Sequence, residues 1–230
     1  MRGPTVAQPR RNVGTKNAIY ARLRRSIVMG RREPGQRLSL QNLAKSFGAS
    51  ITPVRDALQM LHQEGLVTIK PRSGYFVTRL TLKQLVDLLD LREILEVAAV
   101  GRAASCITDA QVAALEQVHS GYTGDDEESV ERYISENRRL HCLIAEMSGN
   151  RELAAMIGHV HDRLACFLVA SHAGQSMLDF THDRLLVALR ANDVAQAQQA
   201  MRDDLKEMRE TTLECVIREE SEFWHLGNHA

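Results

Sequence analysis

The chain of 230 residues is 44% hydrophobic and 25% charged, which is the composition of a folded globular protein. No apolar run approaches the roughly 20 residues of a membrane-spanning helix, and the N-terminus lacks the apolar segment of a secretory signal, so we expect no membrane partner. The net charge is zero but divided, because residues 1–79 hold 15 Lys and Arg against three acidic residues, whereas residues 80–230 hold 14 against 26. A basic module followed by an acidic one predicts that the first module binds a polyanion.

Four cysteines bear on the redox compartment of the chain. They lie far apart in the sequence and form no Cys-x-x-Cys pair, which argues against a disulfide framework and against a zinc ribbon. We therefore expect reduced thiols and a cytoplasmic protein. Residues 1–15 are basic and are expected to form a disordered tail. The chain has no Gly-rich phosphate loop and no Ser/His/Asp spacing typical of a nucleophile, so we expect no enzyme.

The start of the basic module has the pattern of three helices. Apolar residues fall on one helical face across residues 16–31. A short helix follows the N-cap Ser39 and ends at Gly48, and a third helix begins with a Ser or Thr cap at residues 50–52 and stops at Gly65. The last two helices are joined by a tight glycine turn and form a helix-turn-helix.

A two-stranded hairpin is predicted after these helices. Residues 66–69 and 75–78 have the composition of strands, and the basic turn between them contains Pro71 and Gly74. A hairpin with a basic tip directly after a helix-turn-helix is a wing. Residues 16–80 are therefore predicted to be a winged helix-turn-helix domain that binds double-stranded DNA.

The expected DNA contacts come mainly from the second helix of the pair and from the wing. The N-terminal residues of such a helix lie nearest the base edges in the major groove, and Arg55, one turn further on, can bind guanine through two hydrogen bonds. The alternative is that Arg55 pairs with Asp56 or Glu64 on a solvated surface. The residues expected at the DNA are Gln41, Ser50, Ile51, Thr52, Arg55, Arg72, Ser73 and Gly74.

The segment from Leu43 to Leu58 follows the pattern LA..LGVSRTPVREAL, and Glu64-Gly65-Leu66-Val67 continues it. Through these residues, positions 16–79 resemble the GntR family of bacterial transcription regulators. That family usually has Arg where this chain has Ile51. An apolar side chain there cannot bond a phosphate but can touch a thymine methyl, which implies an operator different from those of close relatives.

Residues 81–225 are predicted to form the second domain, an all-α antiparallel bundle of about six helices, so that the fold as a whole is mainly α. Strands are hard to find after residue 80, and short breaks separate the helical segments. The expected helices lie near residues 82–106, 109–121, 128–148, 151–172, 176–191 and 193–223.

Four polar residues of the second domain are candidate metal ligands. With a turn at residues 192–193, His182 lies 10 residues before it and Asp204 lies 11 after it, so the two can face each other in an antiparallel hairpin. Asn137 and His141 share a face of another helix. Two imidazoles, a carboxylate and an amide oxygen suit a divalent ion such as Zn, Ni or Mn. The alternatives are hydrogen-bonded, partly buried histidines, or a metal-free polar pocket that binds an organic effector.

Three arginines are candidates to hold an acidic effector, because a guanidinium forms a two-pronged contact with a carboxylate. They are Arg92, Arg102 and Arg163. The alternative for each is an arginine on a solvated helix face. His159 and His161 lie two residues apart and point to different helix faces, so at most one of them can join the site.

Three segments of the second domain carry a further resemblance: Leu91-Arg92-Glu93-Ile94-Leu95-Glu96, Leu140-His141 with Gly149-Asn150, and His182 to Leu205. Through them, residues 82–220 resemble the FCD ligand-binding domain of the FadR-like GntR subfamily. In metal-binding members of that subfamily, one Asp and three His hold the ion. By position, Asn137 replaces that Asp and Asp204 replaces the last His, whereas His141 and His182 are kept.

Together these patterns predict a ligand-responsive transcription regulator. We expect it to bind as a homodimer, whose two-fold symmetry requires a short palindromic operator. The resemblance implies a small carboxylate or related metabolite as the effector, and repression as the commoner mode. Two alternatives are a constitutive DNA binder without an effector and a DNA-tethered metalloenzyme, in which His141, His182 and Asp204 would activate water.

Overall fold

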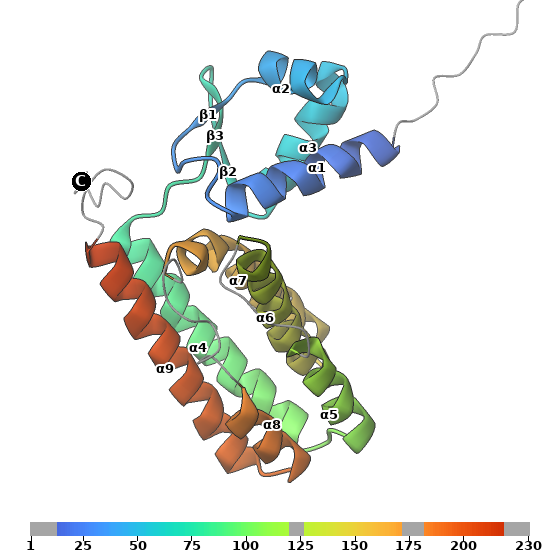
Figure 1. Cartoon of the computed structure of the whole chain (residues 1–230), viewed down its shortest axis with the longest axis vertical. Coiled ribbons are helices and arrows are strands. Elements are labelled where there is room, and N and C mark those ends of the chain that lie inside the picture. The colour runs from blue at the N-terminus through green and yellow to red at the C-terminus, as the bar shows by residue number, and fades with distance from the viewer. Residues whose placement is uncertain (1–12, 120–126, 172–181, 219–230) are drawn as a thin grey trace, which may run out of the picture.

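The computed structural model describes residues 13–119, 127–171 and 182–218, and the chain is mainly helical. A small N-terminal unit (residues 13–80, the head) lies on one end of a helical bundle (residues 81–218), as Figure 1 shows. This arrangement confirms the predicted fold class. Of the predicted tail, residues 1–12 lie outside the described residues, and the first helix already begins at Val13.

The head consists of α1 (Val13–Val28), β1 (Arg37–Leu38), α2 (Leu40–Phe47), α3 (Ile51–Gln63), β2 (Val67–Lys70) and β3 (Gly74–Val77). The Ser39 hydroxyl caps α2 by accepting a hydrogen bond from the Asn42 amide at 3.4 Å. Gly48 ends α2 with a φ of +58°, a conformation that strains any residue with a Cβ atom. This turn allows α3 to begin only three residues later.

The wing has three strands rather than the predicted two. Strands β2 and β3 form the expected antiparallel hairpin, with Val67 opposite Val77 and Lys70 opposite Gly74. Strand β1 pairs with the other edge of β3, where Arg37 lies opposite Phe76. A strand of two residues has no periodicity, which is why the sequence did not indicate it.

Apolar side chains of α1 and α3 form the centre of the head. Ile19 and Leu23 from α1 and Leu58 and Leu61 from α3 are at most 2% exposed and belong to one hydrophobic cluster. Burial of each such side chain stabilises the fold by roughly 1.5–3 kcal/mol. The same cluster continues into the bundle through Tyr133, Ile134, Ala165 and Met208, so the head is packed on the bundle rather than tethered to it.

The bundle consists of α4 (Leu82–Ala104), α5 (Asp109–Glu116) with the short 3₁₀ turn Gln117–His119, α6 (Glu127–Met147), α7 (Arg151–Ser171), α8 (Asp183–Arg190) and α9 (Val194–Arg218). Helix α4 packs against α6, α7 and α9, and a capping box between Thr81 and Gln84 starts it. The prediction of a helix over residues 176–191 needs correction at its start. Residues 176–181 lie outside the described residues, and His182 is the N-cap of α8 rather than a residue within it.

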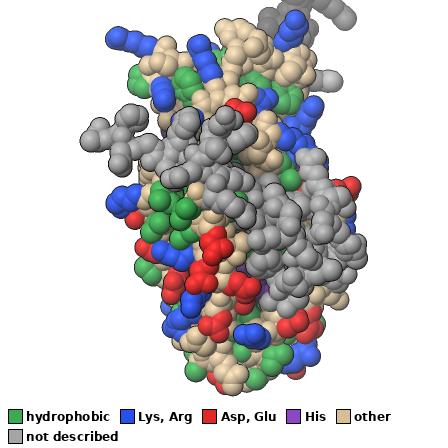
Figure 2. Space-filling view, turned by 60° about the vertical axis from the view of Figure 1, so that its left-hand side comes forward, with side chains coloured by type: hydrophobic (Ala, Val, Ile, Leu, Met, Phe, Trp, Pro, Cys, Tyr) green, Lys and Arg blue, Asp and Glu red, His purple; other side chains and the backbone are tan. Residues whose placement is uncertain are grey.

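The charge division found in the sequence is visible on the surface. In Figure 2, Lys and Arg side chains project from the head, and Asp and Glu side chains gather on the bundle face below it. The surface of the head therefore favours a polyanion, as its composition predicted.

Candidate nucleic-acid interface and polar cluster

The predicted DNA contacts all lie in the head, and all are exposed except Gly74, which is half-buried. Ser50 occupies the N-cap of α3, but its side chain makes no capping hydrogen bond, which leaves the hydroxyl available to a phosphate or base. Arg55, on the first turns of α3, forms no ion pair with any described residue. Glu64 is instead bound by Tyr20 and Arg24. The alternative in which Arg55 pairs with an acidic neighbour therefore finds no support.

The tip of the wing presents a basic side chain in an unusual backbone conformation. Arg72 has a φ of +63°, which costs a non-glycine residue roughly 1–2 kcal/mol. Ser73 closes the turn by donating its amide hydrogen to the carbonyl of Lys70 at 3.1 Å. The turn thus holds Arg72 exposed at the end of the hairpin.

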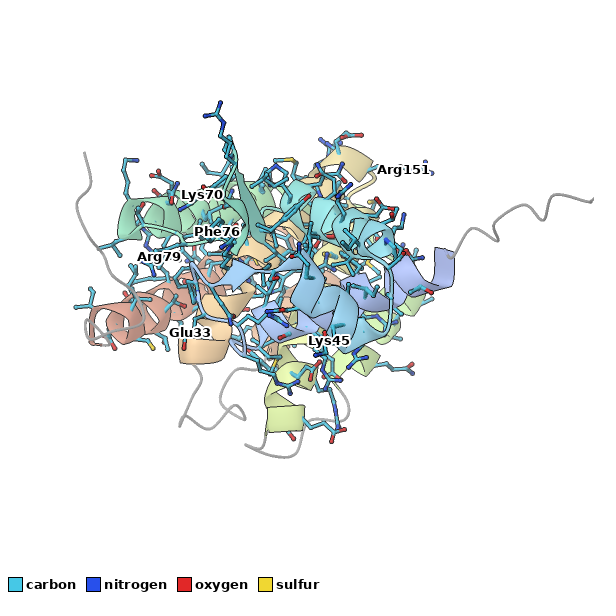
Figure 3. The ribbon with its side chains drawn as sticks, turned by 90° about the horizontal axis from the view of Figure 1, so that it is seen from above. Glu33, Lys45, Lys70, Phe76, Arg79 and Arg151 are labelled. Carbon is cyan, nitrogen blue, oxygen red and sulfur yellow. The ribbon has the colours of Figure 1, made fainter. Side chains whose placement is uncertain are left out.

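Two exposed lysines of the head were not singled out by the sequence analysis. Lys45 lies on α2 and Lys70 at the end of β2, well apart in the view onto the head (Figure 3). The Nζ atom of Lys70 lies 4.9 Å from the centre of the Phe76 ring, which fixes its charge on the wing. The excess of basic over acidic residues in this module was the sequence signal that could have identified the two lysines.

A buried polar cluster occupies the bundle between α4, α6 and α7. Its members are Arg92, Glu96, His141 and His161, each at most 3% exposed. Oε1 of Glu96 accepts hydrogen bonds from Nε of Arg92 at 2.7 Å and from Nε2 of His161 at 2.8 Å. Nδ1 of His141 contacts Oε2 of Glu96, although the two atoms are not aligned for a hydrogen bond. Nη2 of Arg92 lies 3.5 Å from Nε2 of His141.

Burial determines which members of the cluster carry charge. Burial lowers the pKa of His141 to about 3, and it lowers the pKa of His161 too, so both imidazoles are neutral at pH 7. Burial alone would raise the pKa of Glu96, but Arg92 and the two histidines hold it well below its usual range. Because both imidazoles are neutral, the guanidinium of Arg92 is the charged neighbour of Glu96. Arg92 and Glu96 are thus a buried ion pair whose charges cancel.

Arg92 has a donor in the cluster that is left without an acceptor. Nη1 of Arg92 is buried and has no hydrogen-bond partner among the described residues. A buried donor left in this state costs about 1–3 kcal/mol, or more when it is charged. The atom therefore marks a place where an acceptor oxygen of a ligand would be stabilising.

A second polar group adjoins the cluster. Nδ1 of His182 lies 3.0 Å from Oδ2 of Asp204, and Nε2 of His182 lies 3.0 Å from Oδ1 of Asn137. The ring of His141 is 5.1 Å from that of His182, centre to centre. The structure thus brings all four candidate metal ligands together, and the expected contact between His182 and Asp204 across the turn is confirmed.

The protons of His182 pose a specific question. A carboxylate only accepts, so Nδ1 donates to Asp204, and a neutral imidazole then presents a lone pair on Nε2. That lone pair faces the amide oxygen of Asn137 at 3.0 Å. A rotated amide, a second proton on the ring, or a cation bound by both atoms would relieve the conflict. Two ligands about 2.1 Å from one ion lie roughly 3 Å apart, so the spacing fits a metal.

Three residues of the buried polar cluster have the spacing of a metal site. One ligand atom each from Glu96, His141 and His161 lie within 4.8 Å of one another. The guanidinium of Arg92, however, already neutralises Glu96, and both imidazoles are neutral, so no negative charge is left to attract a cation. Among the predicted ligands, Asn137 lies at Nε2 of His182 and Asp204 lies at Nδ1, on a different edge of the ring, so these two residues do not face one common point.

The other candidate residues lie outside the cluster. Arg102 is exposed and its Nε lies 3.5 Å from the carbonyl of Ser148, and Arg163 is half-buried against Gly65 of the head. Of the two neighbouring histidines, His161 joins the cluster and His159 is exposed, as their spacing allowed. The sequence analysis did not single out Glu96, although its position four residues after Arg92 was a usable signal.

Comparisons with known proteins agree with this architecture. The gntR family of bacterial regulatory proteins matches residues 15–77, and the FCD domain matches residues 87–207, which is more than half of the chain. The chain belongs to the GntR family and carries an FCD domain. The family and its named relatives make it a transcription regulator, in agreement with the prediction that it is not an enzyme.

Individual relatives support the same assignment. The HTH-type transcriptional regulator YdhC of Bacillus subtilis (strain 168) is 30% identical over 164 residues, which cover 68% of this chain and 70% of the relative. The HTH-type transcriptional repressor RspR of Escherichia coli (strain K12) is 28% identical over 210 residues, or 90% and 91% of the two chains. The structure of E. coli McbR/YncC shares the fold, with a TM-score of 0.73 and 24% identity over 88% of this chain and 98% of the other. Among the described residues, no helix is long and apolar enough to cross a membrane.

Proposed function

We propose that this GntR regulator acts in the cytoplasm as a repressor, that it binds a short palindromic operator as a homodimer, and that a small carboxylate controls it. The exposed N-terminal end of α3 and the basic wing support direct reading of a DNA site. RspR, which is similar over nine-tenths of this chain, is a repressor, and this supports the mode of action.

The unpartnered Nη1 of Arg92 carries the proposal for the effector. It is a buried donor without a hydrogen-bond partner among the described residues, so a ligand that brings an acceptor oxygen to it would be stabilised, and a carboxylate is such a ligand. A carboxylate offers two oxygens to a planar guanidinium. Neutral histidines beside it add hydrogen bonds without adding a competing charge.

We further propose that a divalent ion, Zn, Ni or Mn, binds between Nε2 of His182 and Oδ1 of Asn137, with His141 as a further ligand. Asp204, predicted as a ligand, then lies at Nδ1 of the ring rather than on the ion. The facing lone pairs of His182 and Asn137 support it. When bound, such an ion supplies a Lewis-acidic centre for oxygen ligands. The protein's own part is to hold the imidazole of His182 in place through Asp204.

The operator is tested by selecting bound fragments from the source genome and footprinting them at physiological salt. A single short palindrome protected by a dimer supports the proposal. Diffuse binding that disappears as salt rises would contradict it, because phosphate contacts alone give that behaviour.

The effector is tested by thermal unfolding of the full chain with a panel of mono-, di- and tricarboxylic acids. An acid present at 100 times its Kd should raise the Tm by roughly 5–10 °C. Arg92→Lys keeps the positive charge but loses the two-pronged guanidinium, so it should remove most of the rise in Tm. Arg102→Lys, on the exposed surface, should leave the rise in Tm unchanged. If no acid stabilises the protein, the constitutive DNA binder without an effector becomes the better description.

A further inference from the structure

We propose that Asp162 is a positioning residue for operator binding, and that it fixes the head on the bundle at an angle set by the buried polar cluster. The idea deepens the proposed function, since it concerns how occupancy of the cluster would be transmitted to the DNA. Three contiguous sets of contacts carry it: those at Asp162, those from Asp162 to the recognition helix α3, and those from its neighbour His161 to the cluster.

Asp162 joins three helices at one carboxylate. It lies on α7, is 4% exposed, and accepts two parallel hydrogen bonds from Arg138 of α6, at 2.6 and 3.1 Å. Its Oδ1 also contacts Nη2 of Arg24, which belongs to α1 of the head. A buried carboxylate held by two guanidiniums has little freedom, because moving either partner leaves charge uncompensated. The ion pair therefore couples α1 to α7.

The contact continues from Arg24 to the end of the recognition helix. Nε of Arg24 lies 3.5 Å from Oε2 of Glu64, the C-cap residue of α3. The hydroxyl of Tyr20 donates a hydrogen bond to the other oxygen of Glu64, and this environment raises the pKa of Tyr20 to about 12, first through burial and then through the Glu64 hydrogen bond. One end of α3 is thus attached, through α1, to the carboxylate on α7.

In the opposite direction, the residue before Asp162 enters the polar cluster. Consecutive residues on a helix point about 100° apart, so His161 can face Glu96 while Asp162 faces the head. Nε2 of His161 lies 2.8 Å from Oε1 of Glu96, the oxygen that also binds Arg92. A ligand that draws Arg92 away from Glu96 would change the hydrogen bond between Glu96 and His161. Because His161 and Asp162 are adjacent on α7, the position of Asp162 would change with it.

The junction has room for the movement that this role requires. A groove of about 1360 Å³ separates α1 from α6 and α7 beside the ion pairs. Its floor on α7 includes the small residues Ala154, Ala155 and Gly158, and its head side includes Tyr20 and Arg24. A head packed without such a gap could not tilt without creating clashes. The ion pairs therefore hold a junction that is not filled by side chains alone.

A double-mutant cycle in the full-length protein tests the proposal without any effector. His161→Gln perturbs the cluster, Arg24→Gln removes the contact with the head, and the two are measured singly and together by titration of the selected operator fragment. We expect His161→Gln to change the operator Kd roughly fivefold or more in the wild-type background and by less than about twofold in the Arg24→Gln background. The control cycle pairs His161→Gln with Asp90→Asn, which breaks the exposed ion pair with Arg209, and its effects should multiply.

Independent effects of His161→Gln and Arg24→Gln would overturn the proposal, and so would an unchanged Kd for His161→Gln alone. Hydrogen exchange of the α1 and α3 amides gives a readout that needs no operator: His161→Gln should speed exchange there, and Arg24→Gln should remove that dependence. If either variant fails to fold, His161→Asn and Arg24→Lys replace it. Because no effector is used, failure of every acid to bind leaves the cycle interpretable, and a protein that binds an acid but shows independent effects rejects only this proposal.

Discussion

Nδ1 of His182 lies 3.0 Å from Oδ2 of Asp204, although the two residues are separated by the whole turn between α8 and α9. The carboxylate fixes the tautomer and the orientation of the ring, so that Nε2 points to Asn137. Nδ1 of His141 also contacts a carboxylate, that of Glu96, and its Nε2 lies 3.5 Å from Nη2 of Arg92. Each of the two imidazoles therefore has a carboxylate at Nδ1, and its Nε2 faces a second polar group.

His182→Ala should remove bound metal and the stabilisation that it gives. The variant loses a ligand, and the remaining imidazole and amide oxygen bind a divalent ion weakly. Metal content after dialysis is measured by mass spectrometry, and the Tm is measured with and without added Zn, Ni or Mn. We expect the metal-dependent rise in Tm to disappear.

The matched control is His159→Ala, because His159 is exposed on α7 and lies outside both polar groups. It should leave metal content and Tm unchanged. If His182→Ala keeps its metal while His161→Gln loses it, the ion is held by Glu96, His141 and His161 instead.

Arg55→Ala should abolish sequence-specific binding and leave the dimer intact. A guanidinium that forms two hydrogen bonds with guanine contributes about 1–3 kcal/mol, which is roughly 5- to 150-fold in operator affinity. Titrations of the operator and of an unrelated duplex measure the two affinities, and light scattering measures the dimer. Lys206→Ala, a charge removal on exposed α9, is the control and should change neither. A retained footprint on the operator would show that α3 is not the recognition helix.

Gly48→Ala should destabilise the head by about 1 kcal/mol. Gly48 has a φ of +58°, and a Cβ atom built there meets nothing within 4 Å, so backbone strain alone sets the cost. Gly48→Asn should cost less, because asparagine tolerates this conformation better. Urea unfolding measures both variants. Equal losses for Ala and Asn would point to a contact at this position rather than to strain.

The sequence predicted the helices, the wing and the facing of His182 and Asp204 well, because these depend on local patterns. Periodicity and caps locate a helix, and a two-residue turn sets the register of the hairpin that follows. The start of α8 was placed too early, since a helical pattern before His182 carried no stop signal. Strand β1 was missed because its pairing with β3 is not a property of its own two residues.

The polar cluster was only partly predictable. Arg92 was selected for its charge, but its ion pair with Glu96 and its contact with His141 depend on how α4 and α6 pack. Arg102 and Arg163 have the same chemistry and lie elsewhere, because helix packing rather than residue type decides which arginine is buried. The link from His161 through Asp162 to Arg24 joins residues far apart in the chain, and no sequence pattern marks it.

The buried imidazoles should make the protein less stable as the pH falls below about 6.5. Burial lowers the pKa of His141 to about 3 and also lowers that of His161, whereas the unfolded chain has histidines near 6.5. The unfolded state therefore binds protons first, and each histidine can reduce the free energy of unfolding by up to about 1.4 kcal/mol per pH unit. The depressed pKa of Glu96 acts in the same direction, but only below about pH 4.3.

Urea unfolding at about pH 7, 6 and 5 isolates the histidine contribution, because Glu96 stays ionised throughout that range. His141→Gln should flatten the dependence of stability on pH, since its amide binds no proton. His159→Gln should leave the slope as it is, because that ring is exposed in the folded state. A slope that persists in His141→Gln and also in His161→Gln would mean that other groups control the acid sensitivity. A slope that falls in both variants would identify the buried cluster as the proton-sensitive part of the fold.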